Sequence, residues 1–123
     1  LTPQQIALME CHGTGTPLGD PIELGALQAI NVGRSRDNPL VMAAVKSNIG
    51  HLEGAAASTG LLKLVALLEH RAATATLHLR SLNPNVAALE SLPSAFATEC
   101  LALRKVGGES NSGGLSSFGF GGT

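Results

Sequence analysis

The sequence predicts an α/β fold, on the basis of three observations. Short apolar runs of strand length alternate with longer segments of helical pattern over the first 70 residues. Three predicted strand ends lead into glycine-containing turns with polar side chains, which is where α/β folds usually build their sites. Apolar residues make up 44% of the 123 residues and charged residues 14%, a balance that supports a packed core and argues against wholesale disorder.

Two apolar runs in the first half of the chain predict buried strands. The first covers residues 6–12 and stops at a turn rich in glycine and threonine over residues 13–17. The second covers residues 40–45 and follows a polar loop over residues 34–39. Both runs have the length of a strand rather than of a helix.

The first helix is predicted to begin at Asp20. Asp20 is placed as the N-cap residue, Pro21 suits the first helical position, and Glu23 stands where a capping box puts its carboxylate. We expect this helix to fray near residues 31–33. Because capping accounts for both acidic residues, it is favoured over a catalytic role for either of them.

A second helix is predicted over residues 55–68, after a turn at residues 48–50. It is apolar on nearly all sides, with Lys63 as its main exception. A helix of this kind is normally buried on all sides, so we expect layers above and below it. Because 123 residues can hardly supply both layers, we expect the chain to be a fragment of a larger domain.

The second half of the sequence is less regular. Residues 72–92 predict an irregular segment that contains a turn at residues 83–84. Further along, residues 101–106 predict a strand, residues 107–114 a flexible surface loop, and residues 115–118 a last strand.

Polar side chains at the three glycine-containing strand ends are the candidates for chemistry. They lie in residues 12–16, 46–53 and 119–123. Taken alone, each has a structural explanation, such as a hydrogen-bonded loop histidine or a surface ion pair. The pattern Gly13-x-Gly15 matches only part of a dinucleotide fingerprint. Nucleotide binding is therefore a weak alternative, to be dropped if nucleotide leaves the thermal stability unchanged.

Both cysteines are expected to be structural. Cys11 precedes His12 in an extended run, where neighbouring side chains point to opposite faces, so a site that contains His12 leaves Cys11 out. Cys100 has neither a glycine turn nor a neighbouring base. Two cysteines are too few for a disulfide framework, which favours a reducing compartment. We expect the cytoplasm, with organellar targeting left open.

Charge and hydropathy argue against several kinds of partner. The formal net charge is −1 and there is no long basic run, so nothing points to nucleic acid. The sequence has no apolar stretch of transmembrane length and no signal peptide at its start. We also predict no metal site.

Three long motifs resemble those of the β-ketoacyl synthases, in the form found in type I polyketide synthases. Residues 12–23 (HGTGTPLGDPIE) resemble the first histidine motif, residues 45–56 (VKSNIGHLEGAA) the second, and residues 116–123 (SSFGFGGT) the C-terminal glycine turn. Their order and approximate spacing also match. The resemblance implies a thiolase-like fold with α/β/α/β/α layers. Residues 1–123 would form most of its C-terminal half, with the second helix in the central layer.

The reaction implied by this resemblance is a decarboxylative Claisen condensation. An acyl group held on a cysteine is extended by a malonyl-type unit on the phosphopantetheine arm of acyl carrier protein, the expected partner. No cofactor would be bound by this segment itself. His12 and His51 would donate hydrogen bonds to the enolate oxygen. The start of the second helix, next to His51, would favour a neutral ring there.

Other site residues carry over from the family's motifs by position. Lys46 would act electrostatically and structurally, paired with Glu53. Thr14 and Thr16 would bind the phosphopantetheine arm through their hydroxyl groups.

The glycine turn and the missing nucleophile complete what the resemblance implies. Phe120 would gate the nucleophile and, beside Gly121, offer a backbone N–H to an oxyanion hole. The family's nucleophilic cysteine lies upstream of this segment, and neither Cys11 nor Cys100 matches it. The intact domain would be an acyltransferase that forms C–C bonds, whereas the isolated fragment is expected to be inactive. Its partners would include the remainder of its own domain and a second copy in a homodimer.

Two alternatives stay open at this point. The parent could be the ketosynthase of a type I fatty acid synthase, which uses the same histidine pair. It could also be a degenerate condensing domain that binds carrier-bound chains without extending them. The presence of His12, His51 and Lys46 argues against degeneracy in this half.

Overall fold

The computed structural model describes residues 1–86, 91–104 and 111–119. Two short 3-10 turns, η1 and η2, occupy Pro3–Gln5 and Glu53–Ala55. The helices are α1 (Gly19–Ile30), α2 (Lys46–Ile49) and α3 (Ala56–His70). The described strands are β1 (Ile6–Glu10), β2 (Leu40–Ala43), β3 (Ala72–Ala73), β4 (Ser94–Phe96), β5 (Leu101–Ala102) and β6 (Ser112–Leu115).

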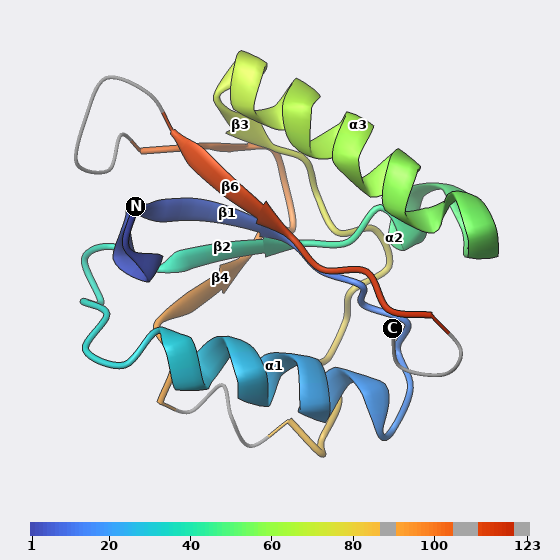
Figure 1. The fold of residues 1–123 in the computed structure, drawn as a ribbon, viewed down its shortest axis with the longest axis horizontal. Coiled ribbons are helices and arrows are strands. Elements are labelled where there is room, and N and C mark those ends of the chain that lie inside the picture. The colour runs from blue at the N-terminus through green and yellow to red at the C-terminus, as the bar shows by residue number, and fades with distance from the viewer. Residues whose placement is uncertain (87–90, 105–110, 120–123) are drawn as a thin grey trace.

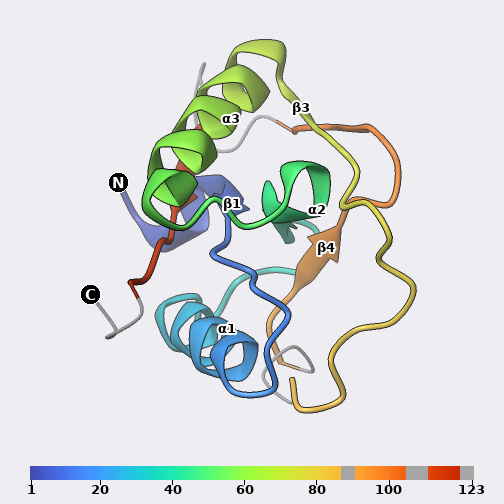
Figure 2. The same cartoon turned by 90° about the vertical axis from the view of Figure 1, so that its right-hand side faces the viewer.

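A four-stranded parallel sheet forms the centre of the fold. Its strand order is β4-β2-β1-β6, and all three strand pairs are parallel. Helix α1 covers one face and α3 covers the other, as Figures 1 and 2 show. The short strands β3 and β5 form a separate antiparallel pair. The predicted α/β class is therefore confirmed.

Alternation along β2 divides the core into two halves. Leu40 and Met42 point to the α1 side, whereas Val41 and Ala43 point to the α3 side, as the two-residue period of a strand requires. On the α1 side the buried residues are Cys11, Leu24, Leu27, Leu40, Met42 and Leu92. On the α3 side they are Leu8, Val41, Ala43, Leu64, Leu67, Ala73, Ala97 and Leu103.

The predictions for the second half are partly wrong. Strand β6 covers Ser112–Leu115, so its first residues fall in the predicted flexible loop and the strand ends where we expected it to begin. Strand β4 was not predicted at all. The predicted strand over residues 101–106 is observed only as Leu101–Ala102, and residues 105–110 lie outside the described part of the chain.

Close packing explains why glycines form a strand here. A Cβ atom on Gly113 would lie 2.6 Å from Leu64 Cδ1, on the α3 side of the sheet. A Cβ atom on Gly114 would lie 2.6 Å from Met9 Sδ. The composition suggested a flexible loop, but both positions instead admit neighbouring side chains to the strand backbone.

Helix α3 has one face packed on the sheet and one face that the described residues leave uncovered. Gly60, Leu64 and Leu67 are buried against the sheet. On the opposite side, Leu61 and Leu62 are 52% and 71% exposed, so within the described residues one face of this helix is uncovered. None of the helices in the described part of the chain has the length and apolar character needed to cross a bilayer.

Replacing Gly113 with alanine tests the close packing of α3 on β6. We expect Gly113→Ala to lower the free energy of unfolding by about 1–3 kcal/mol, because the new methyl group overlaps Leu64. Gly25→Ala is the matched control. Its Cβ meets nothing within 4 Å, and alanine favours a helix interior, so it should raise stability by roughly 0.5–1 kcal/mol. Denaturant unfolding of both variants gives the comparison, and equal effects would contradict the packing argument.

Candidate active site

Three loops meet at the carboxyl edge of the sheet, because the strands they follow are parallel. His12 follows β1, Lys46 follows β2, and Phe118 follows β6. Backbone hydrogen bonds continue between these strands beyond their ends, from Cys11 N–H to Ala43 O at 2.7 Å and from Ser116 N–H to Glu10 O at 3.0 Å. The first two of the predicted glycine-containing segments, residues 12–16 and 46–53, therefore begin side by side, whereas residues 120–123 of the third lie outside the described part of the chain.

The His12 ring is held at its Nδ1 atom by two donors. The backbone N–H of Phe118 and the Nζ of Lys46 each lie 3.4 Å from Nδ1. A ring nitrogen that accepts from an N–H carries no proton itself, so the proton of the neutral ring is placed on Nε2. The edge-on contact with the Phe118 ring, at 5.4 Å between centroids, further fixes the plane of the imidazole.

The His51 ring reaches the same tautomer by a different contact. Its Nδ1 accepts the backbone N–H of Glu53 at 3.0 Å, in the turn that precedes α3. The ring proton is again on Nε2. The two imidazoles lie edge to face, with centroids 5.7 Å apart and planes at 88°. The two rings therefore lie close together, each with a contact at Nδ1 that leaves the proton on Nε2, and N–H donors of this kind suit stabilisation of a developing oxyanion.

Gly13 shapes the turn that follows the first histidine. Its φ of +51° lies in the left-handed region, which favours glycine. A Cβ atom there would also lie 2.8 Å from the Cβ of Ala44, in the loop after β2. Both constraints let the His12 and Lys46 loops approach each other.

The predicted capping box of α1 is wrong. The helix begins at Gly19, so Asp20 is its second residue rather than its N-cap, and its carboxylate accepts the N–H of Gly15 at 3.0 Å. The side chain that caps the helix start is Thr16, whose Oγ1 accepts the N–H of Gly19 at 3.0 Å. The sequence pattern was misleading because several residues of this loop can cap the same helix.

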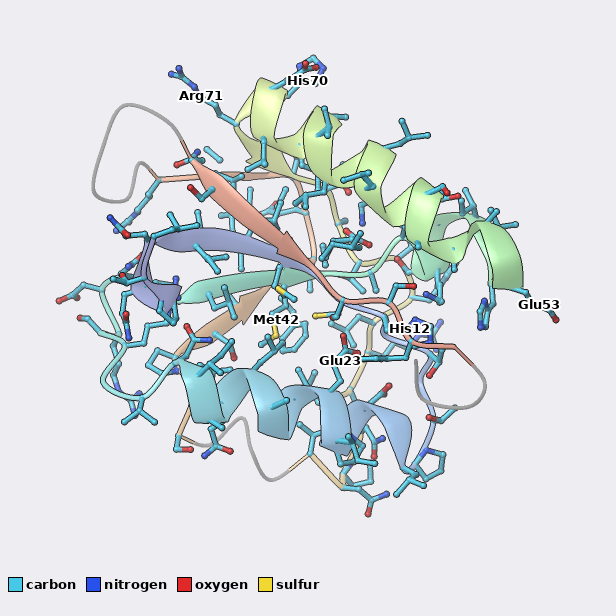
Figure 3. The ribbon with its side chains drawn as sticks, in the orientation of Figure 1. His12, Glu23, Met42, Glu53, His70 and Arg71 are labelled. Atoms are coloured by element: carbon cyan, nitrogen blue, oxygen red, sulfur yellow. The ribbon has the colours of Figure 1, made fainter. Side chains whose placement is uncertain are left out.

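Glu23 has a different role from the one predicted. It is only 4% exposed, and its carboxylate accepts the backbone N–H of His12 at 2.7 Å and that of Gly13 at 2.9 Å. It also accepts the hydroxyl of Ser116, which follows β6. Figure 3 shows Glu23 pointing from α1 to the end of the sheet beside His12. The carboxylate thus fixes the backbone of the histidine loop against the last strand.

Burial and nearby charges favour the neutral form of His12. Burial lowers the pKa of His12 most, the Lys46 ammonium lowers it further, and Glu23 acts in the opposite direction. The pKa of Lys46 is also lowered by burial, against the raising effects of Glu23 and Glu10. A neutral imidazole is the form that can donate from Nε2 while accepting at Nδ1.

The expected pairing of Lys46 with Glu53 is not observed. Glu53 is exposed and lies at the outer end of α3, away from His12 (Figure 3). Lys46 instead contacts His12, and the ion pair found among the described residues joins Lys63 to Glu10. Glu53 contributes its backbone N–H to His51 rather than its carboxylate to Lys46.

The remaining predicted residues fall into three groups. Thr14 lines a cleft beside Lys46, and its hydroxyl lies 3.4 Å from that of Thr16. Cys11 is buried in the core on the α1 side, where burial first, then Glu23 and Glu10, raise its pKa, so it stays a thiol. Phe120 and Gly121 lie outside the described residues.

Sequence reasoning missed two buried charged residues. Glu10 is fully buried at the end of β1. Arg34, in the predicted polar loop, is 5% exposed and donates to the carbonyl oxygens of Pro3, Ile6 and Asn38. A charged residue inside an otherwise apolar strand was the one available signal for Glu10, whereas no local pattern distinguishes Arg34 from a surface arginine.

The fold and the site are those of a parallel α/β protein with two histidines at the carboxyl edge of its sheet. Comparison with known sequences makes this more specific. The profile of the beta-ketoacyl synthase C-terminal domain matches residues 1–80. The chain belongs to the β-ketoacyl synthase family.

Relatives and solved structures agree with this membership. The chain is 46% identical to a subunit of the phenolphthiocerol/phthiocerol polyketide synthase of Mycobacterium tuberculosis, over 96% of this chain and 8% of that protein. It is 42% identical to polyketide synthase GfsA of Streptomyces halstedii, over 100% of this chain and 2% of that protein. The chain thus spans a small part of the relatives it matches.

The fold is also that of solved ketosynthases. Ketosynthase twelve of the bacillaene polyketide synthase from Bacillus amyloliquefaciens superposes with a TM-score of 0.84 at 38% identity, covering 99% of this chain and 22% of that one. An oxazolomycin ketosynthase domain from Streptomyces albus gives 0.85 at 32% identity, covering 99% and 22%. The thiolase-like fold is therefore confirmed.

Removing Lys46 tests the electrostatic control of His12. We expect Lys46→Met to move the pKa of His12 upward, because a cation that opposes protonation is lost. Glu53→Gln is the matched control and should leave the pKa of His12 unchanged. If Glu53 paired with Lys46, as first expected from the sequence, its replacement would change the pKa of His12 as well. A histidine NMR titration measures both.

The lowered pKa of His12 also makes the stability of the fold depend on pH. The unfolded state takes up a proton on this histidine near its ordinary pKa of 6.5, and the folded state does so only at lower pH. The His12 contribution should therefore lower stability as pH falls below about 6.5. Lys46→Met should lose less stability as the pH falls, because its His12 pKa lies closer to the ordinary value. An unchanged His12 pKa in that variant would refute the role given to Lys46.

Proposed function

We propose that the chain forms part of a ketosynthase that catalyses decarboxylative Claisen condensation in polyketide biosynthesis. The observation that carries this proposal is the histidine pair, with centroids 5.7 Å apart and both Nδ1 atoms engaged by N–H donors. Similarity to polyketide synthases supports it. The alternative of a fatty acid synthase ketosynthase receives no specific support from these relatives.

The histidine pair would act in the decarboxylation step. When the C–C bond to the carboxylate of a malonyl thioester breaks, carbon dioxide leaves. The electron pair of the broken bond stays on the thioester, which becomes an enolate. The Nε2–H groups of His12 and His51 would donate to the enolate oxygen. The enolate carbon then attacks an acyl thioester, and the thiolate of that thioester departs with the electron pair of the broken C–S bond.

The other residues would support this step. Lys46 and Glu23 would hold His12, one at its ring and the other at its backbone. Thr14, which lines the cleft beside Lys46, and Thr16 would contact the phosphopantetheine arm of an acyl carrier protein. Thr16 would keep its hydrogen bond to the start of α1 at the same time.

The uncovered side of α3 supports a larger assembly. Leu61, Leu62 and Val65 are exposed there, on the helix that the family places between two sheets. We propose that the remainder of the ketosynthase domain covers this face. Acyl carrier protein and a second copy of the domain would complete the working enzyme, and the nucleophilic cysteine would lie outside these 123 residues.

Replacing His51 in the intact ketosynthase tests the division of labour. We expect His51→Ala to slow malonyl decarboxylation by about 10²–10³, because one oxyanion donor is lost, while acylation of the nucleophile stays near its normal rate. Stopped-flow release of carbon dioxide and mass spectrometry of the acyl-enzyme measure the two steps separately. An equal fall in both steps would contradict the proposed roles.

The isolated chain provides an independent test. We expect no acyl adduct on Cys11 or Cys100 after incubation with an acyl thioester, because burial and the carboxylates of Glu23 and Glu10 keep Cys11 protonated and Cys100 does not match the nucleophile of the family. Intact-mass spectrometry under native conditions detects a stoichiometric adduct if one forms. Such an adduct would overturn the view that the nucleophile lies elsewhere.

A further inference from the structure

A buried ion pair joins the end of β1 to helix α3. Glu10, the last residue of β1, is completely buried, and its Oε2 lies 3.0 Å from the Nζ of Lys63 on α3. Lys63 is itself only 13% exposed. Neither residue takes part in the chemistry proposed above, yet they join the strand that leads to His12 and the helix that follows His51.

Lys63 lies on the face of α3 that packs on the sheet. Lys63 faces the sheet, whereas its neighbours Leu62 and Leu61 are 71% and 52% exposed. Gly60, one turn earlier, brings the helix close to the sheet, because a Cβ atom there would lie 2.8 Å from Leu115 Cδ1 and 3.6 Å from Glu10 Cγ. The helix is thus seated so that its one interior charge reaches the end of β1.

The second oxygen of the Glu10 carboxylate accepts a hydrogen bond from the start of α2. Glu10 Oε1 accepts the backbone N–H of Val45, the residue that precedes Lys46 at the start of α2. A single carboxylate at the end of β1 therefore contacts the start of α2, next to Lys46, and helix α3, which follows the His51 turn. Its charge is balanced by Lys63, and its two oxygens set the spacing between β1, α2 and α3.

Stability alone is a poor explanation for such a pair. Removing two charges from water is costly, and apolar side chains of similar volume often fill a core equally well or better. Hydrophobic residues also could not accept the Val45 N–H, which would stay unpaired inside the protein. The pair is better explained by the geometry it imposes than by the stability it adds.

We propose that Glu10 and Lys63 are positioning residues that set the separation of the two histidines. The proposal rests on the proposed condensing function for its catalytic readout. The distance between the His12 and His51 rings depends on where β1 ends relative to the turn before α3. The ion pair holds α3 against the end of β1, and through that helix it constrains the turn that follows His51. A small shift there would misplace one N–H donor, and displacements near 1 Å can cost a catalyst about 10²-fold.

The experiment compares four variants of the intact ketosynthase. Glu10→Gln keeps an oxygen for the Val45 N–H and loses the charge, Lys63→Met removes the ammonium, and the double variant Glu10→Gln/Lys63→Met removes both charges together. Arg34→Met is the matched control, because it deletes a buried charge at the amino end of the same strand β1, far from the histidines. Melting temperature, kcat and KM for malonyl decarboxylation, and a crystal structure are obtained for each.

We expect both single variants to melt at lower temperature, because each leaves a buried polar group without its partner. The double variant should recover most of that loss, yet its kcat should stay about 10- to 100-fold low with KM little changed. Its crystal structure should show a changed distance between the His12 and His51 rings. Arg34→Met should lose melting temperature and keep its kcat at a temperature where it is folded.

Two outcomes would overturn the proposal. A double variant with normal kcat, or one whose histidine rings keep their 5.7 Å separation, would mean that the ion pair serves the fold alone. If the unmodified ketosynthase showed no decarboxylation, the proposed function would fail instead. In that event the ring separation in the double variant still decides whether Glu10 and Lys63 position the histidines.

Discussion

Backbone N–H groups at the ends of parallel strands need acceptors, and two buried carboxylates meet that need here. Glu23 accepts from His12 and Gly13, just past the end of β1, and Glu10 accepts from Val45, just past the end of β2. Loops that leave a sheet inside a protein cannot rely on water for these bonds. The carboxylates replace water and at the same time fix where each loop goes, which is what a precise site requires.

These two carboxylates place negative charge close to the site, and two lysines balance that charge. Lys63 neutralises Glu10, and Lys46 contacts the His12 ring, where its charge opposes that of Glu23. Uncompensated carboxylates would raise the pKa of a nearby histidine and favour its charged form. Burial and Lys46 act in the opposite direction on His12 and lower its pKa, so the ring stays neutral. Burial raises the pKa of Cys11, the same carboxylates raise it further, and the thiol stays protonated.

Local sequence pattern predicted the elements whose signals are local. The β1 and β2 runs, the two long helices and the burial of Cys11 follow from short-range periodicity and strand alternation. Glu23 was misread because a capping box is also a local pattern, whereas its partner Ser116 is 93 residues away. Strand β6 was misplaced because its glycines resemble a loop until Leu64 and Met9 are seen to occupy the space beside them.

The site depends both on local contacts within a turn and on contacts between residues far apart in the sequence, as the two histidines show. His51 is oriented by a neighbour two residues along the chain, since Glu53 N–H fixes its tautomer. His12 is oriented by Lys46 and Phe118, which are 34 and 106 residues away. One ring is therefore set by its own turn and the other by the sheet. The position of the His51 ring relative to the His12 ring therefore depends on how α3 packs on the end of β1. The buried contacts across that junction matter to the chemistry as much as the imidazoles themselves.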